Sequence, residues 1–89
     1  MSDVLSEAQS ILKDRQDQYG DPEKQWGAIA VCWTEWLTVR GVMVEGARLD
    51  ASDAIALMEI LKIMRLANGY HRDSVVDMIN YAVIYDKCS

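Results

Sequence analysis

Apolar residues recur at helical spacing along almost the whole chain, and this pattern predicts four helices. In the first segment, about residues 3 to 18, one side of the helical wheel carries Val4, Leu5, Ala8, Ile11 and Leu12. The second helix runs from Pro22 to about Arg40, and its inward stripe consists of Trp26, Ile29, Ala30, Trp33 and Leu37. Both segments are therefore predicted to be amphipathic helices that direct one face toward a shared core.

The third and fourth segments complete the pattern. The third helix, about residues 51 to 67, is apolar on nearly every side, which is typical of a central helix or of one covered on two sides. The fourth, about residues 73 to 87, is predicted to present to the core Val75, Met78, Ile79, Ala82 and Tyr85. The sequence thus predicts an all-α fold, a compact bundle that forms one domain over residues 1–89. The apolar third helix also predicts a homo-oligomer, a dimer or larger, with that helix close to the interface.

The connections between these segments contain residues that end and start helices. Tyr19-Gly20 is predicted to end the first helix, because glycine readily adopts the left-handed conformation found at many helix ends. Asp21 and Pro22 start the second, since the aspartate can accept from unpaired amides and proline is favoured at the first helical position. A longer connection of about ten residues, 41 to 51, contains VMV at 42 to 44, a short strand signal. It is interpreted as a loop, a hairpin or a contact with another subunit.

Composition narrows the classes of partner. The chain has 89 residues and a net charge of -5, which argues against nucleic acid as a partner because that contact needs a basic face. Neither a bilayer-spanning stretch nor a signal peptide is evident, so a soluble intracellular protein with no membrane partner is expected. Cys32 and Cys88 lack CxxC spacing and have one histidine to assist them, which predicts reduced thiols and no zinc site.

Several polar residues stand where the helical pattern would place apolar ones, and such positions are candidates for function. Arg15 is aimed at the bundle or its rim, where it either pairs with a carboxylate or contacts a ligand. Asp53 either caps its own helix or is buried beside a cation. Lys62 and Arg65 either form the solvent face of the third helix, with Glu59 as a local partner, or hold phosphate oxygens.

The segment HRDSVVDMINY, residues 71 to 81, is the densest polar cluster. Strips of the fourth helix predicted to face away from the core carry Asp73, Asp77, Asn80 and Tyr81. Ser74, with Asp77 three residues later, resembles a capping box. His71 is either a helix-end residue or a ligand contact.

Three motifs cover most of the chain in order: R-x-x-x-YGDPE at 15 to 23, D-A-I-A-L-M-x-x-L-K-I-x-R-L at 53 to 66, and H-R-D-S-x-x-D-x-x-x-Y at 71 to 81. Together they resemble an uncharacterised family of small tailed-phage proteins. This resemblance implies a phage origin, and therefore the cytoplasm of an infected bacterium, but it carries no activity with it.

The chain also shows a weaker resemblance to the MazG-like all-α nucleoside triphosphate pyrophosphohydrolases, small helical bundles that often dimerise. Those enzymes hold magnesium with E-x-x-E on one helix and E-x-x-D on the next, because acidic groups one turn apart grip hard cations. Here Lys62 stands three residues after Glu59, at the second acidic position, and Asp73 and Asp77 are spaced by four. The magnesium-binding set therefore looks incomplete.

Three functional hypotheses follow. In the first, the protein is a non-catalytic binder that needs no cofactor and sequesters a nucleotide immune signal of the host. Phosphates meet the cationic side chains, while Tyr19 or a tryptophan stacks on a base. The ligand-binding residues of this hypothesis are Arg15, Tyr19, Lys62, Arg65, His71, Asp73 and Asp77.

The second hypothesis is a magnesium-dependent pyrophosphohydrolase that works through Asp73 and Asp77, with Glu59 or Asp53 from a neighbouring helix. The third is a protein-binding module that inhibits a host enzyme through an acidic helical surface. The nucleotide binder ranks first because the polar residues point toward apolar surroundings, which a purely protein-facing surface would not require.

Overall fold

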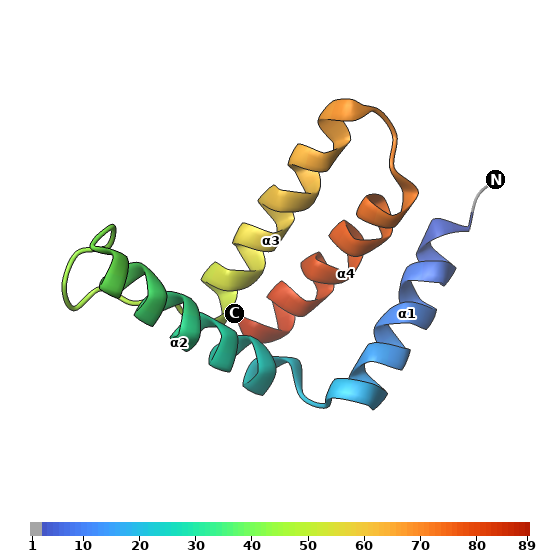
Figure 1. The fold of residues 1–89 in the computed structure, drawn as a ribbon. Coiled ribbons are helices and arrows are strands. Elements are labelled where there is room, and N and C mark those ends of the chain that lie inside the picture. The colour runs from blue at the N-terminus through green and yellow to red at the C-terminus, as the bar shows by residue number, and fades with distance from the viewer. Residues whose placement is uncertain (1–2) are drawn as a thin grey trace.

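The computed structural model describes residues 3–89 and contains four α-helices and, within this range, no β-strand (Figure 1). The helices are α1 (Val4–Tyr19), α2 (Pro22–Arg40), α3 (Ala51–Arg65) and α4 (Arg72–Cys88), with a 3-10 turn, η1 (Leu66–Asn68), after α3. The predicted all-α fold of four helices is confirmed. The strand signal at residues 42–44 is not realised, because these residues lie in the loop between α2 and α3.

The helix ends follow the predicted local chemistry. Gly20 has a φ of 82° and ends α1, a conformation that L side chains rarely adopt. The Asp21 carboxylate accepts from the Glu23 amide at 3.1 Å and caps α2. Asp50 and Asp53 form a reciprocal capping box at the start of α3, which confirms the capping interpretation of Asp53. Hydrogen bonds from the Asp53 amide and the Ser52 hydroxyl lower the pKa of the Asp50 carboxyl.

Three helices lie side by side, and α2 crosses one end of them (Figure 1). α4 occupies the middle position, with antiparallel α3 on one side and α1 on the other. The first half of α2 packs across the ends of α3 and α4, whereas its second half extends away from the bundle and the 41–50 loop returns beside it. The molecule is consequently elongated, with extents of 49 × 32 × 19 Å.

The hydrophobic core lies where α2 crosses α3. Trp26 and Ala30 of α2 are buried against Ala54 and Ile55 of α3. The two alanines allow the helix backbones to approach closely, and the Trp26 ring meets the Tyr81 ring of α4 edge to face at a centroid distance of 5.6 Å. The predicted inward stripe of α2 is therefore correct, since its partly buried members, including Ile29 and Trp33, also pack against this cluster.

The predicted core face of α4 is correct only in part. Ala82 and Tyr85 are exposed, and the predicted members that are half-buried are Val75, Met78 and Ile79. The buried positions are Ser74, Val76 and Asn80, while Tyr81 and Ile84 pack on the core cluster. The error has two causes. First, α4 has neighbours on two sides, α1 and α3. Second, its innermost strip carries polar side chains, and a prediction based on apolar periodicity places polar side chains in solvent.

Two further predictions of burial need correction. Leu5 is 62% exposed, so the buried contact of α1 is made by Ala8. α3 is not the central helix: it packs against α4 along its length and against α2 near its start, and its open face exposes Leu57, Ile60, Leu61, Ile63 and Met64. Despite this apolar surface, none of the helices within residues 3–89 has the combined length and hydropathy needed to cross a bilayer.

Replacing Ile55, which has 0% exposure, with alanine should lower the free energy of unfolding by about 3 kcal/mol, because it removes buried methyl groups and leaves a cavity at the helix crossing. The matched change Leu5→Ala should alter it by less than about 0.5 kcal/mol. Urea unfolding followed by circular dichroism measures both. Equal losses in the two variants would show that the core is not located at the crossing.

Candidate functional site

A hollow of about 380 Å³ lies between α1, α3 and the start of α4. We call it the polar hollow, and its lining residues are Ile11, Arg15, Lys62, Arg65, His71, Asp73, Val76 and Asp77. Six of the seven ligand-binding residues predicted from the sequence therefore lie around one space, although they come from three helices and are up to 62 positions apart along the chain.

An ion pair between Lys62 and Asp77 forms the floor of this hollow. The Lys62 ammonium lies 2.8 Å from one Asp77 oxygen, and Arg15 lies 3.6 Å from the other. Lys62 is only 8% exposed, so the interpretation that it belongs to the solvent face of α3 with Glu59 as its partner is wrong. Asp77 likewise faces α3 and not solvent, because a buried ammonium requires a nearby negative charge.

Arg65 and His71 lie at the entrance. Arg65 is exposed and forms no ion pair with any residue of the described range 3–89. His71 caps α4: its Nδ1 accepts from the Ser74 amide at 3.1 Å and lies 2.7 Å from the Ser74 hydroxyl. Since Nδ1 accepts, the ring proton of neutral His71 lies on Nε2, which remains able to donate. The predicted Ser74–Asp77 capping box is wrong, because Ser74 is the third helical residue and not the cap.

A second hollow, of about 320 Å³, adjoins the first at Arg15. We call it the aromatic hollow, because three of its lining side chains are aromatic. Its lining residues are Arg15, Gln16, Tyr19, Pro22, Gln25, Trp26, Tyr81 and Ile84. Tyr19, the seventh predicted site residue, is exposed at its edge. Arg15 thus borders both spaces, and the turn at residues 19–22 forms part of the wall of the aromatic one.

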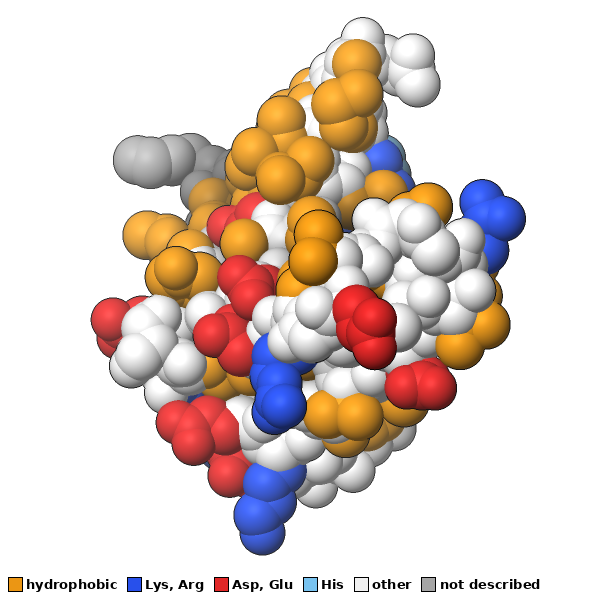
Figure 2. Space-filling view, turned by 90° about the vertical axis from the view of Figure 1, so that its left-hand side faces the viewer, with side chains coloured by type: hydrophobic (Ala, Val, Ile, Leu, Met, Phe, Trp, Pro, Cys, Tyr) orange, Lys and Arg blue, Asp and Glu red, His pale blue; other side chains and the backbone are white. Residues whose placement is uncertain are grey.

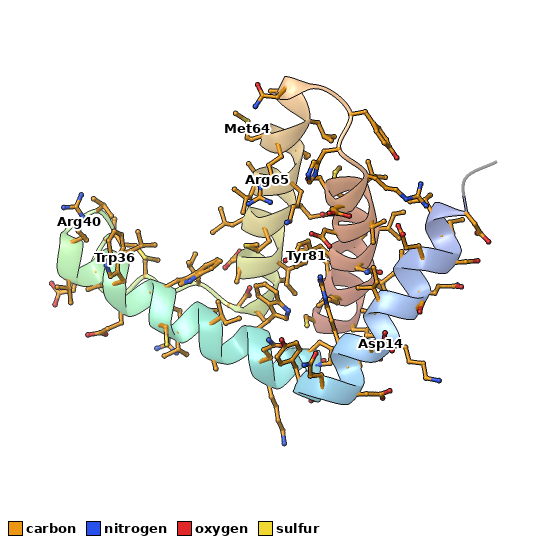
Figure 3. The ribbon with its side chains drawn as sticks, turned by 45° about the vertical axis from the view of Figure 1, so that its right-hand side comes forward. Asp14, Trp36, Arg40, Met64, Arg65 and Tyr81 are labelled. Carbon is orange, nitrogen blue, oxygen red and sulfur yellow. The ribbon has the colours of Figure 1, made fainter. Side chains whose placement is uncertain are left out.

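Tyr81 lines the aromatic hollow and was missed as a site residue. Figure 3 shows its side chain in the space between α4 and α3, with Arg65 on α3 above it. Burial raises the pKa of the Tyr81 hydroxyl, and the negative charge of Asp77 raises it further, so the phenol is protonated and available as a donor at neutral pH. The available sequence signal was its position one helical turn after Asp77, but the incorrect orientation of α4 placed both on the outside.

Two buried polar atoms near this region lack hydrogen-bond partners within the described residues. They are Oε1 of Glu59 and Nδ2 of Asn80, on facing helices α3 and α4. Burial raises the pKa of the Glu59 carboxyl, since the charged form loses hydration without gaining a donor. The negative charge of Glu59 contributes to the raised pKa of Tyr81, although Glu59 lines neither hollow.

The charge of the polar hollow differs from that of the whole protein. Three cationic side chains and two carboxylates line it, so it is locally positive in a chain whose net charge is -5. Because Lys62 is buried and the hollow is partly enclosed, these charges are less screened than surface charges. The site therefore suits an anion that also carries hydroxyl or amine donors for the two carboxylates.

Comparison with known proteins supplies the family. Residues 3–89 match the family described as "Domain of unknown function (DUF6378)", and the chain belongs to it. It is 34% identical over 86 residues to the Gene 55 protein of Mycobacterium phage L5, and 32% identical over 80 residues to the Gene 55 protein of Mycobacterium phage D29. These matches cover 94% and 89% of this chain but 51% and 48% of the relatives, so the chain spans about half their length. No solved structure matches. The predicted resemblance to an uncharacterised phage protein family is confirmed.

Replacing Lys62 with methionine should lower the free energy of unfolding by about 2 kcal/mol, because Asp77 would remain between helices with only the more distant Arg15 as a partner. The cost is smaller than for a fully buried pair, since both side chains retain some contact with water. The double change Lys62→Met with Asp77→Leu should recover most of the loss. Chemical unfolding of the single and double variants measures the coupling free energy between Lys62 and Asp77. If the double variant is no more stable than Lys62→Met alone, the unpaired Asp77 is not the cause of the loss.

Glu59→Gln should stabilise the protein at neutral pH. A carboxyl whose folded-state pKa is raised favours folding when it is protonated, and this contribution is lost as the pH rises above about 4.5, the ordinary pKa of glutamate. The stability difference between the variant and the wild type should therefore shrink toward zero below that pH. Urea unfolding at acidic and neutral pH tests this, and a Gln variant that is less stable than wild type at neutral pH would refute it.

Proposed function

We propose that this phage domain binds a small phosphorylated nucleotide, with phosphate in the polar hollow and the base in the aromatic hollow. The observation that carries the proposal is the position of Arg15, which borders a cationic space on one side and an aromatic space on the other. A nucleotide has the same two parts side by side. Each hollow has a volume in the range of natural small-molecule pockets, which begins near about 300 Å³.

The polar hollow supports phosphate binding through three cationic side chains that differ in burial. Lys62 is fixed and largely desolvated, whereas Arg15 has a half-exposed side chain that contacts Asp77 only at 3.6 Å. Arg65 is exposed at the entrance and can turn inward. Guanidinium groups form paired hydrogen bonds with phosphate oxygens, so the two arginines supply specificity while the lysine supplies a fixed charge.

The carboxylates restrict which anions fit. Asp73 and Asp77 line the same hollow, and both repel a highly charged polyphosphate. They accept well from hydroxyl groups, as ribose would offer. The arrangement therefore favours a ligand with few phosphate charges and free sugar hydroxyls over an inorganic polyanion.

The aromatic hollow supports base binding. Tyr19 is exposed at its edge and can stack on a base, while the Tyr81 hydroxyl and the amides of Gln16 and Gln25 supply donors and acceptors for the base edge. Stacking on an aromatic side chain contributes about 1–3 kcal/mol per base. This wall is built by the end of α1 and the start of α2, so the YGDP turn determines its shape.

Binding without hydrolysis is the form of this activity that the carboxylates favour. Asp77 is held by Lys62 and Arg15, so the acidic pair Asp73 and Asp77 is not free to share a metal ion. A phage protein that binds a nucleotide tightly lowers its free concentration in the host. We therefore propose that the ligand is a nucleotide signal of host immunity and that the protein acts by sequestering it.

Isothermal titration of the wild-type protein with a panel of linear and cyclic nucleotides tests the proposal. At least one member should bind saturably, and Arg65→Ala should weaken that binding by about 10- to 100-fold, since each charge-assisted phosphate contact contributes about 1.5–3 kcal/mol. Arg15→Ala and Tyr19→Ala should each weaken it by about tenfold or more. Arg48→Ala is the matched control, because Arg48 is exposed in the 41–50 loop and lines neither hollow.

Two outcomes would overturn this function. If no nucleotide in the panel binds, or if binding is unchanged in the Arg15, Tyr19 and Arg65 variants, the site is elsewhere or absent. If incubation with magnesium converts the nucleotide to products on chromatography, the protein is a hydrolase and the sequestration proposal fails. Recovery of the intact nucleotide from the denatured complex is the expected result.

A further inference from the structure

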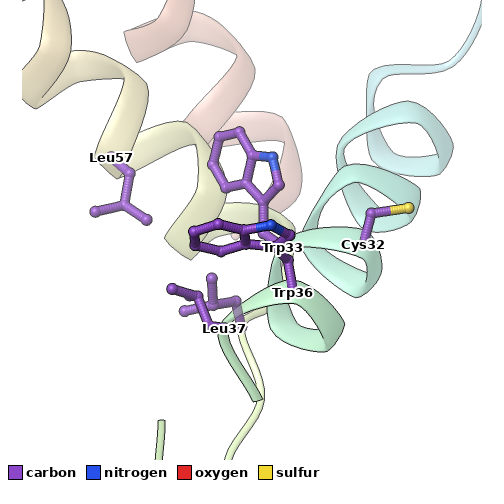
Figure 4. A pocket seen from close by; sticks show the side chains of 6 residues that line it. Cys32, Trp33, Trp36, Leu37 and Leu57 are labelled. Carbon is purple, nitrogen blue, oxygen red and sulfur yellow. The ribbon is translucent and has the colours of Figure 1, made fainter. Parts of the chain in front are cut away.

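An apolar corner lies between the second half of α2 and the start of α3, away from both hollows described above. It encloses about 570 Å³, and its lining residues are Cys32, Trp33, Trp36, Leu37, Leu49 and Leu57. None of them is charged. Figure 4 shows the two indole rings of Trp33 and Trp36 in the middle of this corner, with Leu37 beside them and Leu57 on α3 opposite.

Apolar surface extends from the corner in two directions. Along α3, the same side continues from Leu57 to Ile60 and Met64 at helical spacing, and Ile60 is 55% exposed. Along the protruding part of α2 and the loop after it, Trp36, Val39 and the loop valines 42 and 44 are exposed. Figure 2, which views the molecule from this side, shows hydrophobic side chains gathered over its upper part, whereas charged side chains gather lower down.

The surface area of the chain is larger than that of a compact monomer of its mass. A folded monomer of 10.1 kDa exposes about 5300 Å², whereas this chain exposes 6270 Å². Its radius of gyration is 14.6 Å, against about 12 Å for a compact domain of this length. The excess area, about 1000 Å², is comparable to the roughly 800 Å² that each partner buries in a stable protein–protein interface.

We propose that two copies of this chain associate through their apolar corners, with the protruding half of α2 of each copy packed over the open face of α3 of the other. A concave corner and a convex apolar helix face occur on the same side of one chain, and a two-fold interface requires this kind of self-complementary surface. The inference is independent of nucleotide binding, because neither hollow contributes to the corner.

The apolar face of a second copy fits this surface better than a charged surface does. Each chain has a net charge of -5, so two copies repel each other at long range, but the uncharged lining of the corner lets them associate without burying a charge. Arg40 lies beside the corner, with its guanidinium 5.6 Å from the centre of the Trp36 ring (Figure 3). It covers part of an exposed indole at the edge of the surface, where interface rims are commonly polar.

Sedimentation velocity over a micromolar concentration series tests the dimer. The wild type should sediment as a dimer at high concentration, and Ile60→Glu should raise the dissociation constant by roughly 100-fold or more, because each interface would bury two unpaired carboxylates. Leu5→Glu is the matched control, since Leu5 is a similarly exposed aliphatic residue on α1, away from the corner. Circular dichroism confirms that both variants remain helical.

Tryptophan fluorescence gives a second readout that depends on the location of the interface. Trp36 is 62% exposed in the single chain, so its quenching by iodide should decrease as the protein concentration rises and the dimer forms. Trp36→Phe should reduce this change, because Trp26 is buried in the core at every concentration and Trp33, the other indole of the corner, is already partly buried in the single chain. A monomer at all concentrations, or a dimer unaffected by Ile60→Glu, would overturn the proposal and assign the corner to another occupant.

Discussion

The ion pair between Lys62 and Asp77 is the contact on which the arrangement of the candidate site depends. It joins α3 to α4 at 2.8 Å, and the same carboxylate reaches Arg15 of α1, so one acidic group connects three helices. The hydrophobic core is small and lies at the crossing of α2 and α3. Away from that crossing, the buried apolar side chains are Ala8 of α1 and Val76 of α4, and the ion pair adds a polar contact between the helices there. The residues that join the three helices by charge are thus also lining residues of the polar hollow.

The local features of the fold could be predicted from the sequence because short-range chemistry decides them. Gly20, Asp21 and Pro22 set the first turn, and the Asp50–Asp53 pair starts α3. The orientation of α4 could not be predicted in the same way. Its buried strip contains Ser74 and Asn80, and helical periodicity assigns such polar positions to solvent, although Ser74 is satisfied locally by the His71 cap.

The candidate site was predictable to the extent that its residues broke the helical pattern. Arg15 and Lys62 stood out because a charge on an apolar strip needs a partner, and the structure places that partner, Asp77, beside both. Tyr81 and Glu59 were noted in the sequence but were not assigned to the ligand site, because a tyrosine or a glutamate on an amphipathic helix is ordinary. Their relevance depends on distances across α3 and α4, which belong to the tertiary structure.

The way in which α1 is attached has a consequence for dynamics. Its one buried residue is Ala8, and its ion pairs to the rest of the protein run from Glu7 to Arg72 and from Arg15 to Asp77. A helix with so little buried area is among the first parts of a protein to open by local unfolding. Arg15 and Tyr19 of α1 also border the hollows, so local opening of α1 would open both hollows to solvent. A molecule bound in either hollow would hold α1 in place and slow the exchange of its amide hydrogens with solvent. Hydrogen exchange in this one helix would therefore report whether the site is occupied.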